Sequence, residues 1–99
     1  MAGGDWKQLF KGIQANDYEL VKYYLRVGID PNYQHPEYMA LPLAESLRYG
    51  HFEITELLLQ HGADASIIEL ESQSTPAALA ESMADKRYDA LIRRYGNTE

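Results

Sequence analysis

The chain has 99 residues and a formal net charge of −6, which allows one domain with a modest core but no deeply enclosed active site. It has no cysteine, which excludes disulfides and thiolate metal sites, and its acidic balance argues against a nucleic-acid partner. No apolar run is long enough to span a membrane, so we expect a soluble, cytoplasmic protein without membrane association.

Glycines recur at one spacing along the chain, at Gly28, Gly62 and Gly96. The separations are 62 − 28 = 34 and 96 − 62 = 34, and each glycine closes a stretch rich in aliphatic residues. The pair Thr75-Pro76 follows Leu41-Pro42 at the same distance. An offset of 36 relates two copies of "LAES", but it aligns four residues only. The period of 34 therefore indicates stacked helical units that bury their apolar faces against one another.

The first predicted helix pair spans about residues 5–34. Asn16 tolerates a left-handed backbone and is expected at the turn between its helices. The second helix then has an apolar stripe at helical spacing, formed by Leu20, Val21, Tyr24 and Leu25. Tyrosines at second-helix positions are expected to fill or edge the core: Tyr18, Tyr23, Tyr24 and, in the last repeat, Tyr88.

The middle pair is predicted over about residues 35–68. Pro42 suits the first position of a helix, and Gly50 suits a left-handed turn between two helices. The apolar stripe returns as Ile54, Leu57, Leu58 and Leu59. Like Gly28 before it, Gly62 is expected to end the second helix in a left-handed conformation.

The last pair is predicted over about residues 69–96. Thr75 is expected to cap its first helix, with Pro76 at the first helical position. Gly96 is expected to end the second helix as Gly62 does. Four basic residues give this copy the polar outer surface of a terminal cap: Lys86, Arg87, Arg93 and Arg94.

The segment "LPLAESLRYGHFEITELLLQHGADAS" from Leu41 resembles the ankyrin repeat. That family's pattern is a Thr-Pro-Leu-His helix start, a Gly-His turn, a Glu-led apolar helix, then Gly-Ala-Asp and a hairpin. This copy has Ala44 in place of the histidine and Glu45 in place of a leucine. The resemblance implies an all-α, ankyrin-repeat solenoid of three helix-turn-helix units, joined by β-hairpin-like loops in a single domain over residues 1–99.

The resemblance also implies a partner-binding surface, because ankyrin proteins bind partners on a concave face of hairpin tips and first helices. Carried over by position, the surface comprises Gln14, Glu37, Tyr38, Ala40, Arg48, Tyr49, Glu71, Ser72, Ser74, Ser82 and Met83. Arg48 and Tyr49 are of types enriched at interface hot spots, so replacing either with alanine is expected to weaken binding by about 1–3 kcal/mol without changing the fold.

This pattern favours a non-catalytic adaptor or regulator that binds a protein and is a monomer when free. A structural or self-assembly element, or a fragment of a longer ankyrin array, remains an alternative. No catalytic residues, metal ligands or cofactors are expected. His51 and His61 lie ten residues apart and cannot form a helical metal-binding pair, and no serine lies in a nucleophile elbow.

Three features have two interpretations each. Trp6 either joins the binding surface or covers the core beside the first helix. His35, in the first hairpin, is either structural or a partner contact. The second hairpin is apolar for a loop, and its side chains either pack on the preceding hairpin or contact a partner: Ile67, Ile68 and Leu70.

Overall fold

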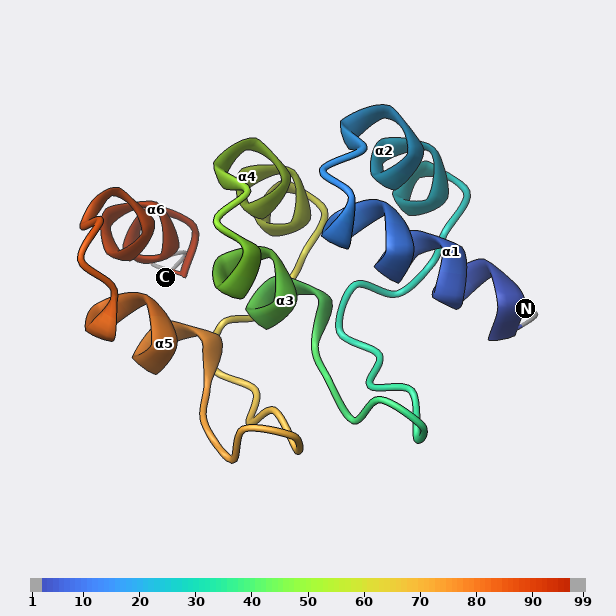
Figure 1. Ribbon diagram of the computed structural model, residues 1–99. Helices are drawn as coiled ribbons and strands as arrows, with labels where there is room; N and C mark the ends of the chain where they lie inside the picture. Colours follow the sequence, from blue (N-terminus) through green and yellow to red (C-terminus); the bar gives the residue numbers. More distant parts are fainter. Residues whose placement is uncertain (1–2, 97–99) are drawn as a thin grey trace.

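The computed structural model describes residues 3–96 and contains six α-helices in that range. They form three consecutive pairs, in which α1, α3 and α5 make one layer and α2, α4 and α6 the other (Figure 1). The predicted all-α repeat fold is confirmed. In chain order the helices are α1 (Gly3–Gln14), α2 (Tyr18–Arg26), α3 (Pro42–Tyr49), α4 (Phe52–Gln60), α5 (Pro76–Ser82) and α6 (Arg87–Gly96).

Left-handed residues close the helices of the first two pairs as predicted. Asn16 and Gly50 have φ of 58° and 69° between the helices of a pair, and Gly28 and Gly62 have φ of 105° and 97° after the second helices. The prediction of a left-handed Gly96 is wrong, because this residue is helical within α6 and has no positive φ.

The starts of the helices follow from local capping. The Thr75 hydroxyl accepts the Ala78 N–H at 3.1 Å, and Pro76 holds the first turn of α5, as predicted. The Asp17 carboxylate caps α2 by accepting the Leu20 N–H at 3.2 Å. Side-chain caps therefore set the start of two of the helices, and Pro42 sets the start of α3.

The predicted apolar stripes form the shared core, in which Val21, Leu25, Ile54 and Leu58 are buried. Tyr88 is buried as well, and Tyr18 and Tyr24 pack against the edge of the core. The prediction for Tyr23 is wrong, since its side chain is largely exposed. It lies two residues after the buried Val21, and two helical steps place it on the opposite side of α2.

The loops at 27–41 and 61–75 project together from the α1, α3 and α5 layer (Figure 1). Gln34 joins them by donating to the Ile68 carbonyl at 3.0 Å and accepting the Leu70 N–H at 2.9 Å. The Glu71 N–H donates to the Met39 carbonyl at 2.8 Å. A single antiparallel bridge between Glu69 and Ser74 gives the second loop its hairpin character.

Trp6 is buried between α1 and the first loop, so of its two interpretations the structure supports the cover over the core. Its ring centroid lies 4.8 Å from that of Phe10, 5.1 Å from His35 and 5.4 Å from Tyr38. The indole N–H donates to the Tyr33 carbonyl at 3.2 Å. These contacts fix the first loop against α1. From residue 3 to residue 96, no helix combines the length and the apolar character that crossing a bilayer requires.

Candidate partner-binding surface

A shallow hollow of about 460 Å³ opens between α1, α3 and the two projecting loops. It is lined by Phe10, Tyr38, Ala40, Glu45, Arg48, Glu71 and Ser72. The structure thus brings together, in one hollow, five residues of the predicted binding surface: Tyr38, Ala40, Arg48, Glu71 and Ser72.

The other residues of the predicted surface lie outside this hollow. Tyr49 is exposed at the end of α3, and Glu37 forms an ion pair with Lys7 at 3.1 Å on the first loop. Ser74 belongs to the bridge of the second loop. The last two residues lie at the end of α5, where Ser82 donates to the Leu79 carbonyl at 2.7 Å and Met83 packs against the core.

Ala40 does not offer the exposed surface that the sequence suggested. It is 5% exposed and belongs to the core cluster, so little of its side chain is open to a partner, and its place in the binding surface stays a prediction. The loop turns inward at Ala40 just before α3 begins. Its small side chain therefore forms the floor of the hollow.

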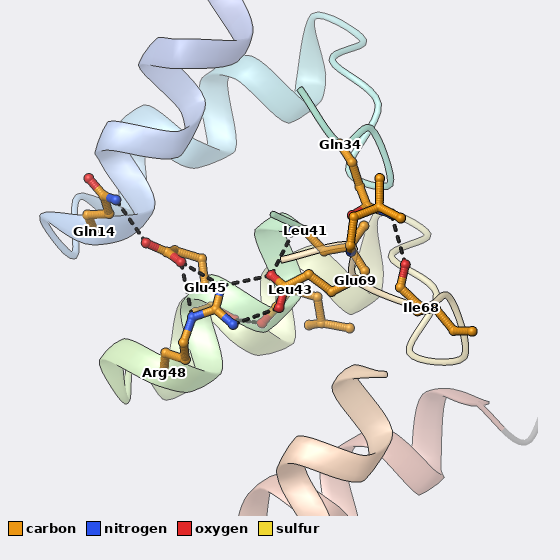
Figure 2. A network of polar contacts seen from close by, with 10 residues as sticks. Gln14, Gln34, Leu41, Leu43, Glu45, Arg48, Ile68 and Glu69 are labelled. Atoms are coloured by element: carbon orange, nitrogen blue, oxygen red, sulfur yellow. Dashed lines mark hydrogen bonds and ion pairs between the residues drawn. The ribbon is translucent and has the colours of Figure 1, made fainter. Parts of the chain in front are cut away.

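Arg48, which lines the hollow, lies at the centre of a polar network (Figure 2). Its two terminal nitrogens each donate to one oxygen of the Glu69 carboxylate, both at 2.7 Å. Nη2 also donates to Glu45 at 2.8 Å. Gln14 donates to the second oxygen of Glu45 at 2.8 Å, and the Leu41 N–H donates to Glu69 at 3.0 Å. The network links α1, α3 and the second loop.

Arg48 is therefore engaged within the chain, and its role in partner binding stays a prediction. The Glu69 side chain is 0% exposed, while the Arg48 side chain is 33% exposed. A carboxylate without contact to water needs charged or N–H partners, and Arg48 supplies the charge. Arg48 holds the second loop against α3, so the contacts that it makes within the chain are structural.

Sequence reasoning did not identify Glu69, although it singled out Ile68 and Leu70 on either side. A signal was present at Glu45, where the ankyrin pattern has a leucine. Glu45 and Arg48 are three residues apart, which places them on one face of a helix. When a charged residue occupies a position that the fold buries, a partner of opposite charge is expected nearby. Here Glu45 is buried beside Arg48.

The network also shifts the pKa values of Glu69 and Arg48. Burial raises the pKa of Glu69, but hydrogen bonds from Arg48, Ser72 and the Leu41 N–H, with the Arg48 charge, outweigh it and leave the pKa below the usual value. The hydrogen bond with Glu69 is the main cause that raises the pKa of Arg48. Both groups therefore remain charged at neutral pH.

This lowered pKa makes stability depend on pH. Because the Glu69 pKa is lower in the folded chain than the ordinary value of 4.5, its stabilisation is fully present above that value and is lost as the pH falls through the folded pKa. We expect urea titrations to show the stability difference between the parent and Glu69→Gln shrinking from about pH 5 to about pH 3. A difference that stays constant over this range would contradict the role of Glu69.

The remaining side chains have simpler roles. His35 stacks on Trp6, and its Nδ1 accepts the Glu37 N–H at 3.1 Å, which favours the structural interpretation. His51 Nε2 lies 3.3 Å from the Gln14 carbonyl oxygen and links the first two repeats. Among residues 3–96, no group of three His, Asp or Glu side chains is arranged to hold a metal ion.

The three apolar side chains of the second loop differ in burial. Ile67 is half-buried, whereas Ile68 and Leu70 are largely exposed, although their backbones are hydrogen-bonded to Gln34. Packing on the first loop therefore does not account for Ile68 and Leu70, and their contact with a partner stays a prediction.

A model of the ankyrin repeat family matches residues 38–69. The chain is 28% identical over 95 residues to the ARF GTPase-activating protein Git of Drosophila melanogaster, a match covering 88% of the chain and 13% of that protein. It is 30% identical over 90 residues to an ankyrin repeat protein of Fowlpox virus, covering 91% and 12%. It is 36% identical over 72 residues to the 2-5A-dependent ribonuclease of Homo sapiens, covering 73% and 10%. The chain thus spans only 10% to 13% of the length of these relatives.

Proposed function

Because this chain is an ankyrin repeat protein, we propose that it acts as a non-catalytic adaptor or regulator that binds a protein partner along its hollow, the end of α3 at Tyr49 and the projecting loops. Ankyrin repeats generally mediate protein–protein interaction. The ribonuclease and the GTPase-activating protein match over a small part of their length, so their named activities are not carried over. We also propose a cytoplasmic location, since a cysteine-free chain has no need of an oxidising compartment.

The observation that carries this proposal is a group of exposed apolar side chains on the two loops. Of the large hydrophobic residues that are exposed between residues 3 and 96, most lie there: Tyr33, Tyr38, Met39, Ile68 and Leu70. The hydrogen bonds that join the two loops hold these residues close together. A group of exposed apolar and aromatic side chains beside a hollow is typical of a recognition surface.

The charges at the hollow indicate the chemistry of the partner. Arg48 faces two carboxylates, those of Glu45 and Glu69, so the three side chains together carry one net negative charge. Glu71 adds another carboxylate to the lining. The hollow therefore suits a partner segment in which an apolar side chain is adjacent to lysine or arginine.

The test compares the partner affinity of variants at the proposed interface with that of a variant on the other helix layer. A partner would be captured from native lysate, and its Kd would be measured for the parent and for Tyr49→Ala and Leu70→Ser. We expect each variant to weaken binding by about 1–3 kcal/mol, because each removes exposed apolar area at the proposed interface. Circular dichroism should remain unchanged, because neither side chain is buried.

Tyr23→Ala is the matched control, since Tyr23 is an exposed tyrosine on α2, in the other helix layer. Its partner affinity should equal that of the parent. If all three variants bound the partner as tightly as the parent, the partner would not bind where we propose. The same would follow if Tyr23→Ala lost as much affinity as Tyr49→Ala and Leu70→Ser.

A further inference from the structure

Three residues other than glycine have a left-handed backbone within residues 3–96. They are Asn16, Met39 and Gln73, with φ of 58°, 53° and 60°. A β-carbon strains this conformation, which glycine adopts without strain. Met39 and Gln73 are 34 residues apart and therefore occupy equivalent positions in consecutive repeats. The backbone of the two projecting loops thus favours glycine at this position, and neither copy has one.

The structure accounts for the other two of these residues. Asparagine tolerates a left-handed backbone better than most residues, so Asn16 suits its turn. The Gln73 side chain donates to the Leu70 carbonyl at 2.8 Å and so stabilises the loop to which it belongs. In both cases the residue type itself offsets the strain.

Met39 has no such compensation. Its backbone is fixed on both sides, because its N–H donates to the His35 carbonyl at 2.7 Å and its carbonyl accepts the Glu71 N–H at 2.8 Å. Its side chain is 42% exposed and, within residues 3–96, is not among those packed on the core. A thioether is also too weak an acceptor to stabilise the turn. Glycine would relieve the strain without any loss of core packing.

Met39 lies at the edge of the hollow. Its neighbours in sequence, Tyr38 and Ala40, line the hollow, and so does Glu71, to which its carbonyl is hydrogen-bonded. Strained backbone is found most often where a ligand is held. Methionine is flexible and polarizable, so an exposed methionine adapts to apolar groups of a partner. Strain, exposure and position therefore indicate recognition.

The charges around Met39 indicate which group accompanies that apolar contact. Lys7 and Glu37 neutralise each other at 3.1 Å, and the network around Arg48 carries one net negative charge. Glu71 forms no ion pair with another residue in the range 3–96. The surroundings of Met39 therefore have two net negative charges, which favour a cation of the partner.

We propose that Met39 is the specificity-determining contact of this surface, kept at a cost in stability because its side chain binds a bulky apolar side chain of the partner. A lysine or arginine next to that side chain pairs with Glu71. The inference rests on the proposed function and adds the residue that selects the partner segment.

The first measurement is urea denaturation of the whole chain. Met39→Gly should raise the folding equilibrium constant roughly threefold to tenfold, because it relieves the left-handed strain. Met39→Ala and Met39→Leu keep the β-carbon and should show no gain. A Met39→Gly variant no more stable than the parent would overturn the claim that this methionine costs stability.

The second measurement is the affinity of peptides selected on the immobilised parent from a random-peptide phage library. These peptides should combine an aromatic or branched aliphatic residue with an adjacent lysine or arginine. Met39→Gly and Met39→Ala should each weaken their binding roughly tenfold. Met39→Leu, which keeps the volume, should stay within about threefold of the parent. Glu71→Gln should also weaken binding, because it removes the partner of the cation.

The variants exclude two other causes of lost affinity. Met39→Gly is expected to be more stable than the parent, so its loss of binding cannot come from unfolding. Met39→Ala keeps the β-carbon, so its loss cannot come from a more flexible loop. Asn16→Gly is the matched control, since it places glycine at a left-handed residue between α1 and α2 that does not line the hollow. It should bind the peptides as the parent does.

The outcomes separate this inference from the proposed function. If the selected peptides lost affinity for Leu70→Ser but bound Met39→Gly as tightly as the parent, the surface would stand and the role of Met39 would be overturned. Selected peptides rich in acidic residues would overturn the pairing with Glu71. If no selected peptide depended on Leu70 or Tyr49, the proposed surface would be wrong, and the role of Met39 would fall with it.

Discussion

Replacing Arg48 with alanine is expected to lower the free energy of unfolding by about 3 kcal/mol, as measured by urea denaturation at neutral pH. The substitution leaves the Glu69 carboxylate, which is 0% exposed, with the Leu41 N–H but without its counter-charge. The expected loss is at the lower end for a broken buried ion pair, because 33% of the Arg48 side chain is exposed to solvent, which weakens the pairing.

Two further variants separate charge from geometry. Arg48→Lys keeps the charge but cannot donate to both oxygens of Glu69 in a planar fork, so it should be intermediate. The double variant Arg48→Met/Glu69→Leu removes both charged partners and should recover most of the loss. If Arg48→Ala were within about 0.5 kcal/mol of the parent, the network would not stabilise the fold.

The network matters for function because it joins the elements that form the hollow. Glu69 begins the part of the second loop that places Glu71 and Ser72 in the lining. When Arg48 no longer holds Glu69 against α3, these two residues lose their fixed position. A loss of partner binding in Arg48→Ala would therefore follow from a displaced loop as well as from a lost contact, and Tyr49 and Leu70 are better probes of the surface.

The fold could be predicted because its signals are local. A left-handed backbone at Gly50, a cap at Thr75 and an apolar stripe around Leu58 each depend on a few neighbouring residues. Repetition at a spacing of 34 then extends these signals along the chain. The hollow could be predicted in part, since Tyr38, Glu71 and Ser72 follow from the positions of the loops.

The features that the sequence did not reveal are contacts between distant residues. Arg48 is of a type common at hot spots, but its residue type cannot show that Glu69, 21 residues later, already occupies its donors. Ala40 lies in a projecting loop, yet the direction of the chain before α3 buries it. Tyr23 is exposed although its equivalents 34 and 68 residues later, Leu57 and Leu91, are buried, and the residue type alone does not show this difference.

Replacing Trp6 with alanine is expected to cost about 3–5 kcal/mol, the range for removing a large buried aromatic side chain. It removes the ring against which Phe10, His35 and Tyr38 pack and leaves a cavity beside α1. Trp6→Phe keeps an aromatic ring but loses the N–H donated to the Tyr33 carbonyl, so most of the stability should return, with a deficit of about 1 kcal/mol from the hydrogen bond.

The loss in Trp6→Ala should also be local, because each repeat contacts only its neighbours. Trp6 contacts α1 and the first loop, so hydrogen exchange should accelerate in α1 and α2 while α5 and α6 keep their protection. Equal acceleration in all helices would mean that the stack unfolds as one unit. Since Tyr38 lines the hollow and packs on Trp6, local opening of the first pair should weaken partner binding before the fold as a whole is lost.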